Sequence, residues 1–178
     1  RNKNQKITAA ELKDYQGSNT SGSAFLYLKP GNYTRGTNEA APQTQFRDVP
    51  MNTPNIRTKN DESFKKGHPL TNEQKVILHH TGYSDTTGVS KGMSKAMQGV
   101  NKQFSQPGES SHVVIDFDGT RYNYARPDQV TFHAGKSMIN GRDNVNDFGV
   151  GIEFQGDTDK TRLTDKQINS FVEYAGPI

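Results

Sequence analysis

Two short apolar runs in the second half of the chain predict buried β-strands. The first is KVILH at 75–79, and the second is FGVGIEF at 148–154. A continuous apolar run of this length is typical of a central strand that is covered on both faces. We therefore expect strands at about 75–79 and 149–154 in the middle of one sheet.

Apolar residues at steps of three and four predict two amphipathic helices. One is expected at about 90–104 and the other at about 165–175, where Thr164 and Gln167 have the spacing of a capping box. The residues expected on the buried faces of these helices are Val89, Met93, Ala96, Met97, Val100, Phe104, Ile168, Phe171, Val172 and Ala175.

A β-hairpin is predicted between these helices. The segment SHVVIDFDGTRYNYA contains two β-rich runs on either side of Asp118-Gly119, a pair that tolerates the positive φ angles of tight turns. Strands are therefore expected at about 112–117 and 121–125. The order strand, helix, hairpin, strand, helix predicts an α/β fold with a central mixed β-sheet flanked by helices.

The first 70 residues differ from the rest of the chain in amino-acid composition and in charge. After a short helix expected at about 9–16 and one strand-like run, AFLYL, the chain is rich in Asn, Thr, Pro, Gly and Lys. We expect a long, irregular N-terminal attachment or linker at 1–70 and a domain at 71–178. The attachment carries 11 Lys/Arg against 6 Asp/Glu, whereas the domain carries 11 against 13. It is expected to bind an anionic polymer without taking part in chemistry, or to be a plain solvated surface.

Composition narrows the class of protein further. The 178 residues are 30% hydrophobic and contain no cysteine, so we expect one domain with a modest core and no disulfide or Cys-based zinc site. No apolar run approaches the ~18 residues of a membrane span. The basic segment lacks the interleaved aromatic residues of a nucleic-acid platform, so no nucleic-acid partner is expected. Because the chain begins at Arg1, we expect a processed or trimmed product.

Four of the five histidines lie where a sheet displays reactive side chains. His79 and His80 end the first strand, His112 begins the hairpin, and His133 lies in the loop segment TFHAGKS. Neighbouring strand residues point to opposite faces, so His79 and His80 are not expected to share one role. The alternative is that these histidines are hydrogen-bonded structural residues.

Glu153 is the candidate acid/base group. It lies in GVGIEF between Ile152 and Phe154, and burial of a carboxylate at such a position raises its pKa toward values useful for proton transfer. The alternative is an ordinary carboxylate at an exposed strand end.

The motifs VILHHTGYS, SSHVVIDFDGTRYNYA, FHAGKS and NDFGVGIEFQG, in this order, resemble those of the zinc-dependent N-acetylmuramoyl-L-alanine amidases. That family includes the peptidoglycan recognition proteins and amidase-type phage lysozymes. The resemblance covers roughly residues 71–178 and implies a central mixed sheet with helices on its faces. Phe132 replaces a Trp, and Gly149 replaces a Ser, of the family pattern.

The resemblance also implies roles for particular residues. It makes His79 the first ligand of Zn2+ and Glu153 the catalytic acid/base, and it leaves His80 at a variable position. The residues that it places along the substrate groove, or near the metal, are His112, His133, Asn146 and Asp147. The family's other zinc ligands, a His and an Asp or Cys, are expected downstream of Ile178; the alternative is a substitute ligand set drawn from His133, His112 and Glu153.

The function implied is hydrolysis of the amide between N-acetylmuramic acid and L-alanine in peptidoglycan. A non-catalytic peptidoglycan-binding module is the alternative, and a wall-associated α/β domain with structural histidines is a third reading. The expected partners are peptidoglycan and anionic wall polymers. We expect a monomer that is secreted or lies in the cell envelope.

Overall fold

The centre of the molecule is a six-stranded sheet. The computed structural model describes residues 27–28, 46–58, 75–83 and 93–175. The strands of the sheet, in spatial order, are β1 (Tyr27–Leu28), β4 (Lys75–His80), β10 (Gly149–Phe154), β5 (Val113–Ile115), β6 (Arg121–Asn123) and β2 (Asp48–Pro50).

The sheet is mixed. Strands β4, β10 and β5 run parallel, β6 is antiparallel to β5, and β1 is antiparallel to β4, while β2 runs parallel to β6. Beside the sheet lie two short ladders: β3 (Ile56–Thr58) pairs with β7 (Gln129–Thr131), and β8 (Met138–Ile139) pairs with β9 (Arg142–Asp143). A single 3-10 turn, η1 (Val145–Asp147), leads into β10. The expected α/β fold with a central mixed sheet is therefore confirmed.

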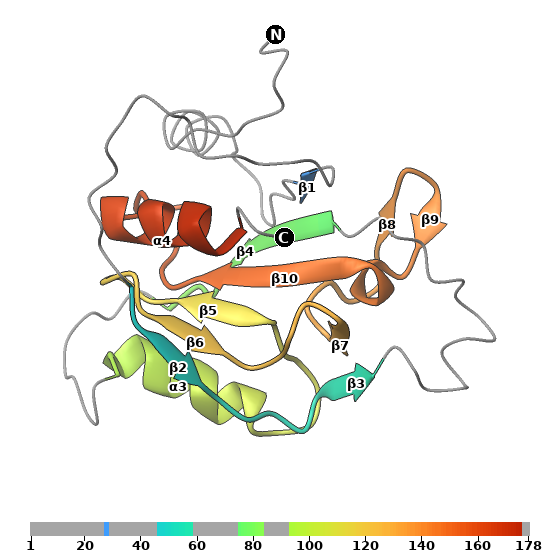
Figure 1. The fold of residues 1–178 in the computed structure, drawn as a ribbon, viewed down its shortest axis with the longest axis horizontal. Helices are drawn as coiled ribbons and strands as arrows, with labels where there is room; N and C mark the ends of the chain where they lie inside the picture. The colour runs from blue at the N-terminus through green and yellow to red at the C-terminus, as the bar shows by residue number, and fades with distance from the viewer. Residues whose placement is uncertain (1–26, 29–45, 59–74, 84–92, 176–178) are drawn as a thin grey trace, which may run out of the picture.

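Two helices cover opposite faces of the sheet: α3 (Lys95–Phe104) and α4 (Asp165–Ala175) (Figure 1). Helix α4 begins with the predicted capping box, because Thr164 Oγ1 accepts the Gln167 N–H at 3.1 Å and Gln167 Oε1 accepts the Thr164 N–H at 3.0 Å. Helix α3 begins at Lys95, later than predicted, because Ser94 caps it by accepting the Met97 N–H.

Alternation along the strands divides the core between the two faces. On the α4 face, Val76 and Leu78 of β4 pack with Ile152 of β10 and with Ile168 and Phe171 of the helix. The opposite face contains two further clusters: one is Met97, Val100, Phe104, Val114, Tyr122 and Tyr124, and the other is Ile77, Val145 and Phe148. His79 and Glu153 have the parity of Ile77, so the strands direct both toward the face opposite α4.

The four strands predicted in the domain share the sheet as expected. Met97 and Val100 are buried and Met93 is partly buried, whereas Val89 and the helix expected at 9–16 lie outside the described residues. The hairpin strands are shorter than predicted, because a turn closes at Asp116, whose backbone carbonyl accepts the Gly119 N–H.

Segments within residues 1–70 supply three strands. Tyr27–Leu28, from the predicted AFLYL strand, forms one edge of the sheet, β2 forms the other, and β3 pairs with β7. A buried arginine fastens β2 to α4: Arg121 donates to both carboxylate oxygens of Asp48 at 2.8 and 2.7 Å and to Glu173 at 3.2 Å. Part of this segment is therefore integral to the sheet.

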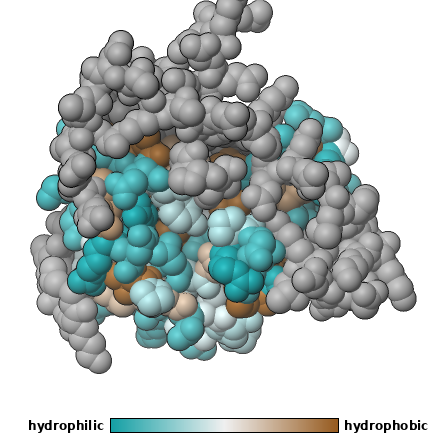
Figure 2. Space-filling model, in the orientation of Figure 1, coloured by the Kyte–Doolittle hydropathy of each residue, from teal (hydrophilic) through white to brown (hydrophobic). Residues whose placement is uncertain are grey.

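The described surface seen in Figure 2 is mostly hydrophilic, with small apolar areas between the polar ones. Tyr83 and Met138 are the large apolar side chains that are exposed within the described ranges. None of the helices in those ranges is long and apolar enough to cross a membrane.

Candidate active site

His79 and Glu153 lie side by side on adjacent strands. In the parallel pairing of β4 with β10, the Cα register places Glu153 opposite His79. Because both side chains point to the face opposite α4 and neighbouring strands are ~4.8 Å apart, the carboxyl and imidazole groups share one patch of that face.

His79 is held as a neutral imidazole. Its Nε2 lies 3.1 Å from Nδ1 of His133, with the rings in a T-shaped arrangement at 5.3 Å between centroids. Burial, together with a smaller contribution from the charge of neighbouring His80, lowers the pKa of His79 to about 4. Neutral imidazole is the form of histidine that can bind a metal ion.

Glu153 has the raised pKa that its sequence context predicts. Burial raises the pKa of its carboxyl to about 8, and the negative charge of Glu109 adds to the effect. A carboxyl with a pKa this close to neutrality both accepts and releases a proton at ordinary pH.

His133 lies in the loop after β7, where Asn146 fixes the backbone. The side-chain Oδ1 of Asn146 accepts the N–H groups of His133 and Ala134 at 3.0 and 2.8 Å. Burial lowers the pKa of His133 well below its usual value, with further contributions from His79 and His112. Asn146 is buried, so its place in this structure is that of a support for the His133 loop.

Asp147 is also buried beneath the site. Its Oδ2 accepts the Asn144 side-chain N–H at 2.7 Å, and its Oδ1 lies 4.0 Å from the Arg57 guanidinium. The same guanidinium lies over the ring of Phe132 at 5.1 Å from its centroid. Sequence reasoning missed Arg57, because it lies in the segment interpreted as irregular attachment, and no local motif marks it.

His112 lies below the surface of the site. It is fully buried, its Nε2 lies 3.0 Å from the Gln129 carbonyl, and its Nδ1 accepts the Gly151 N–H at 2.9 Å. The Thr131 hydroxyl lies 3.0 Å from the same Nδ1. This network assigns the proton to Nε2 and ties β10 to β7. With its ring fully covered, His112 is placed to support the site, whereas the resemblance placed it near the metal or substrate.

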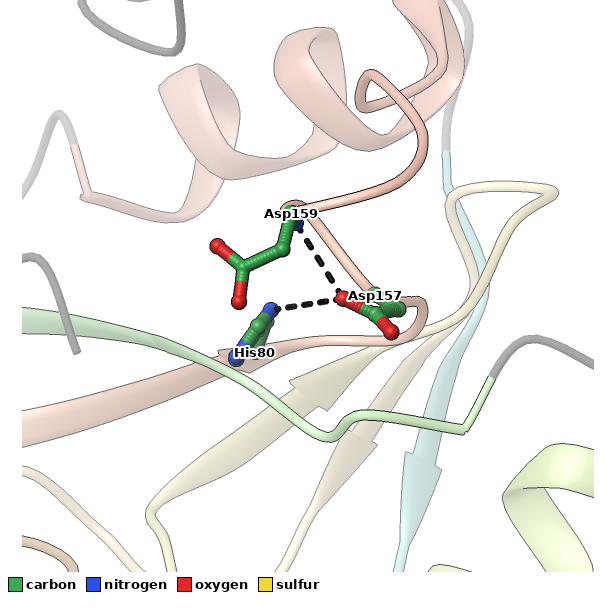
Figure 3. Close-up of side chains that lie close together, drawn as sticks. All are labelled: His80, Asp157 and Asp159. Atoms are coloured by element: carbon green, nitrogen blue, oxygen red, sulfur yellow. Dashed lines mark hydrogen bonds and ion pairs between the residues drawn. The ribbon is translucent and has the colours of Figure 1, made fainter. Parts of the chain in front are cut away.

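His80 points to the other face of the sheet and belongs to a separate polar group. A ligand atom from each of His80, Asp157 and Asp159 lies within 4.8 Å of the others (Figure 3). Nδ1 of His80 accepts the Thr158 N–H at 2.9 Å, and Asp157 pairs with Lys160 at 2.7 Å. These bonds tie His80 and Asp157 to the loop that follows β10. The adjacent histidines therefore have different partners on opposite faces of the sheet.

Comparison with known proteins decides the family. A family model described as N-acetylmuramoyl-L-alanine amidase matches residues 69–177. The chain belongs to the N-acetylmuramoyl-L-alanine amidase family. It is 43% identical over 63 residues to the 1,6-anhydro-N-acetylmuramyl-L-alanine amidase AmpD of Enterobacter cloacae, covering 35% of this chain and 33% of that protein. With AmpD of Haemophilus influenzae it shares 35% identity over 69 residues, covering 39% and 37%. The chain thus spans about a third of the length of these relatives.

Solved amidase structures also resemble the chain. A crystal structure of an AmpD selenomethionine derivative aligns with a TM-score of 0.48 and 23% identity, over 72% of this chain and 70% of that one. The amidase LysC from Clostridium intestinale aligns with a TM-score of 0.40 and 24% identity, over 56% and 58%.

The groups around His79 show how far this part of the chain fits the zinc ion expected for the family. The neutral imidazole beside a carboxyl fits one ligand position with an acid/base next to it. Among the described residues, however, no set of three possible ligands lies around His79. The group of three possible metal ligands found among these residues is His80, Asp157 and Asp159. The substitute ligand set fits less well, because the Nδ1 and Nε2 atoms of His112 are occupied within the sheet.

Proposed function

We propose that this protein hydrolyses the amide bond between N-acetylmuramic acid and L-alanine in peptidoglycan. The observation that carries the proposal is the pairing of Glu153 with His79 across β10 and β4, in a chain of the amidase family. A proton-exchanging carboxyl and a neutral imidazole on one sheet face are two of the groups that such a hydrolysis uses. The relatives named above are amidases of muramyl-L-alanine bonds, which supports the same substrate class.

His79 is the ligand that this part of the chain would offer to zinc. When bound, zinc supplies a Lewis acid that polarises the amide carbonyl and acidifies water. One histidine does not complete a zinc site, so the remaining ligands, a His and an Asp or Cys, are proposed to come from outside the described residues.

Glu153 performs the proton transfers in this proposal. In its ionised form the carboxyl takes a proton from the attacking water. The protonated carboxyl then delivers that proton to the leaving amine of L-alanine. With a pKa of about 8 set by burial, the carboxyl is balanced between these two duties.

The region around Glu153 and His79 is the proposed binding place for the glycan and stem peptide. The His133 loop borders it, Asn146 holds that loop through two hydrogen bonds, and Asp147 is buried next to Asn146. We further propose that the basic residues that precede Phe46 add affinity for anionic wall polymers. The monomeric state and the extracytoplasmic location stay predictions.

The alternative is a module that binds peptidoglycan without cutting it. Such a module has no need of a neutral histidine beside a carboxyl with a raised pKa, and both features are present here. The hydrolytic proposal is therefore favoured.

The deciding experiment compares two carboxylate-to-amide variants on a purified muropeptide, following the release of L-alanine amino termini by mass spectrometry. Glu153→Gln should lower turnover by roughly 100-fold or more, because it removes the proton acceptor and retains the shape. Asp159→Asn, an exposed residue of the His80 group on the other face, should leave turnover unchanged. If the wild-type protein binds the muropeptide and releases no amine, the binding-module alternative is correct.

A further inference from the structure

The His133 imidazole occupies a notch in β10 that two glycines create. A Cβ atom built on Gly151 would lie 2.8 Å from both Cβ and Cδ2 of His133, and one built on Gly149 would lie 3.1 Å from its Cε1. Real Cβ atoms do not approach other atoms within 3.0 Å, so any side chain at 151 would displace the ring. The absence of two side chains therefore lets the imidazole lie directly against the strand that carries Glu153.

The notch holds one side of the His133 ring, and contacts with three other residues hold its backbone and its remaining edges. Asn146 holds the backbone of His133 through two hydrogen bonds, and the His112 ring lies 5.9 Å away in an edge-on arrangement. The remaining polar edge of His133, Nδ1, meets Nε2 of His79 at 3.1 Å. The ring is thus built into the fold with one nitrogen directed at the proposed metal ligand.

Two arrangements of the proton between these rings are chemically distinct. In the first, His79 donates from Nε2 to Nδ1 of His133, so the lone pair of His79 lies on Nδ1. In the second, His133 donates from Nδ1 to Nε2 of His79, and neutral His79 carries its own proton on Nδ1. Only the first arrangement allows neutral His79 to bind a metal.

The metal role proposed for His79 selects the first arrangement. His133 occupies the Nε2 edge of His79 at 3.1 Å, so a metal ion could meet only Nδ1 of that ring. Nδ1 of neutral His79 offers a lone pair only when the proton lies on Nε2, and Nδ1 of His133 is then the acceptor that faces it.

We propose that His133, seated in the Gly149–Gly151 notch, is the positioning residue of His79: it accepts the Nε2–H of His79 and directs the Nδ1 lone pair to the metal. The inference rests on the metal role of His79 proposed above. His133 would then have two roles: it orients the metal ligand His79, and it borders the proposed substrate groove. Partners of this kind fix the ring and the tautomer of metal-binding histidines in general.

The direct test uses the full-length protein without metal, with nitrogen-15 in its histidines. Nuclear magnetic resonance should detect a coupling across the hydrogen bond between Nε2 of His79 and Nδ1 of His133, with the proton attached to His79. A proton attached to His133 Nδ1, or no coupling at all, would overturn the assignment. This measurement needs neither zinc nor hydrolysis.

The second test measures zinc affinity by competition with a chelator. His133→Phe fills the notch with a ring that lacks an acceptor, and it should weaken zinc binding by about 10- to 100-fold. His133→Asn keeps an acceptor close to the position of Nδ1 and should restore most of that loss. Unchanged affinity in the Phe variant, or an equal loss in both variants with unchanged thermal unfolding, contradicts the positioning role.

The two proposals fail in different ways. If wild-type protein binds zinc with the predicted variant order and releases no amine from muropeptides, the hydrolytic function is wrong and the positioning role stands. If zinc does not bind in the wild type, the metal role of His79 and the positioning role both fall.

Discussion

The glycine notch makes a sharp prediction for Gly151→Ala. Gly151 has an ordinary extended backbone, so the substitution brings no backbone strain and tests the space alone. The added methyl group would overlap His133, and all three of its nearest atoms belong to that one residue. The ring must therefore move away from β10 or the strand must shift.

The size of the effect follows from two opposing contributions. Overpacking of this kind costs about 1–3 kcal/mol. Replacing glycine by alanine increases the free energy of unfolding by about 0.4–1 kcal/mol, because alanine reduces the conformational entropy of the unfolded chain. The mid-range values, ~2 and ~0.7 kcal/mol, leave a net loss of ~1.3 kcal/mol, which for a protein of this size lowers Tm by about 3–5 °C.

Gly99→Ala provides the matched control. Gly99 lies within α3, and a Cβ atom there would be 3.7 Å from the Tyr83 ring, an ordinary van der Waals contact. Because alanine is favoured over glycine by up to ~1 kcal/mol in a helix, this variant should be at least as stable as wild type.

The assays are differential scanning calorimetry of the metal-free protein and zinc competition. Gly151→Ala should lower both Tm and zinc affinity, and the double variant Gly151→Ala with His133→Ala should recover part of the lost stability, because the clash is removed. A Gly151→Ala protein with wild-type Tm and wild-type zinc affinity would refute the notch. So would strictly additive effects in the double variant.

Three further predictions concern charge. Burial raises the pKa of Glu153 from 4.5 to about 8 in the folded state, so the metal-free protein should lose stability as pH rises through that interval, and Glu153→Gln should flatten the profile in denaturant titrations. Asp48→Ala should destabilise the protein by about 1–3 kcal/mol, because it leaves buried Arg121 with a poorer set of partners; an unchanged midpoint would show that Glu173 alone suffices. Removing residues 1–26, which precede β1 and carry 4 Lys/Arg against 2 Asp/Glu, should weaken wall binding at low salt and leave muropeptide turnover intact. Cutting at residue 70 should also destabilise the sheet by removing β1, β2 and β3, and equal wall binding at low salt after the shorter cut would exclude the charge contribution.

The sequence predicted the parts of the fold whose signals are local. The strand at 75–80, the capping box at Thr164 and the hairpin around Gly119 each follow from a periodicity or a turn chemistry within a few residues. Edge strands β2 and β3 have no such signal. They are three residues long, and their pairing depends on partners more than 70 residues away in the chain.

The candidate site was predictable to the extent that strand alternation determines it. The places of His79 and Glu153 at the ends of two strands predicted that they could lie together, and the register confirms that they are neighbours. The position of His112 could not, because a histidine at the start of a strand looks the same whether it points to solvent or into the sheet, and here its surroundings cover it fully. Gly149 and Gly151 are visible in the sequence, but the need for glycine there is not. It comes from a tertiary contact with the ring of His133, which lies 18 residues before Gly151.

The geometry of the proposed chemistry is set by the hydrophobic core on the other side of the sheet. Glu153 neighbours His79 only in the register in which Val150 pairs with Val76 and Ile152 with Leu78. A slip of one residue would place Glu153 next to His80 or Leu78, on the α4 side, and would turn the apolar residues of one strand away from α4. Burial of those residues against Ile168 and Phe171 opposes the slip. Packing on the α4 face therefore fixes which of the two adjacent histidines meets the carboxyl.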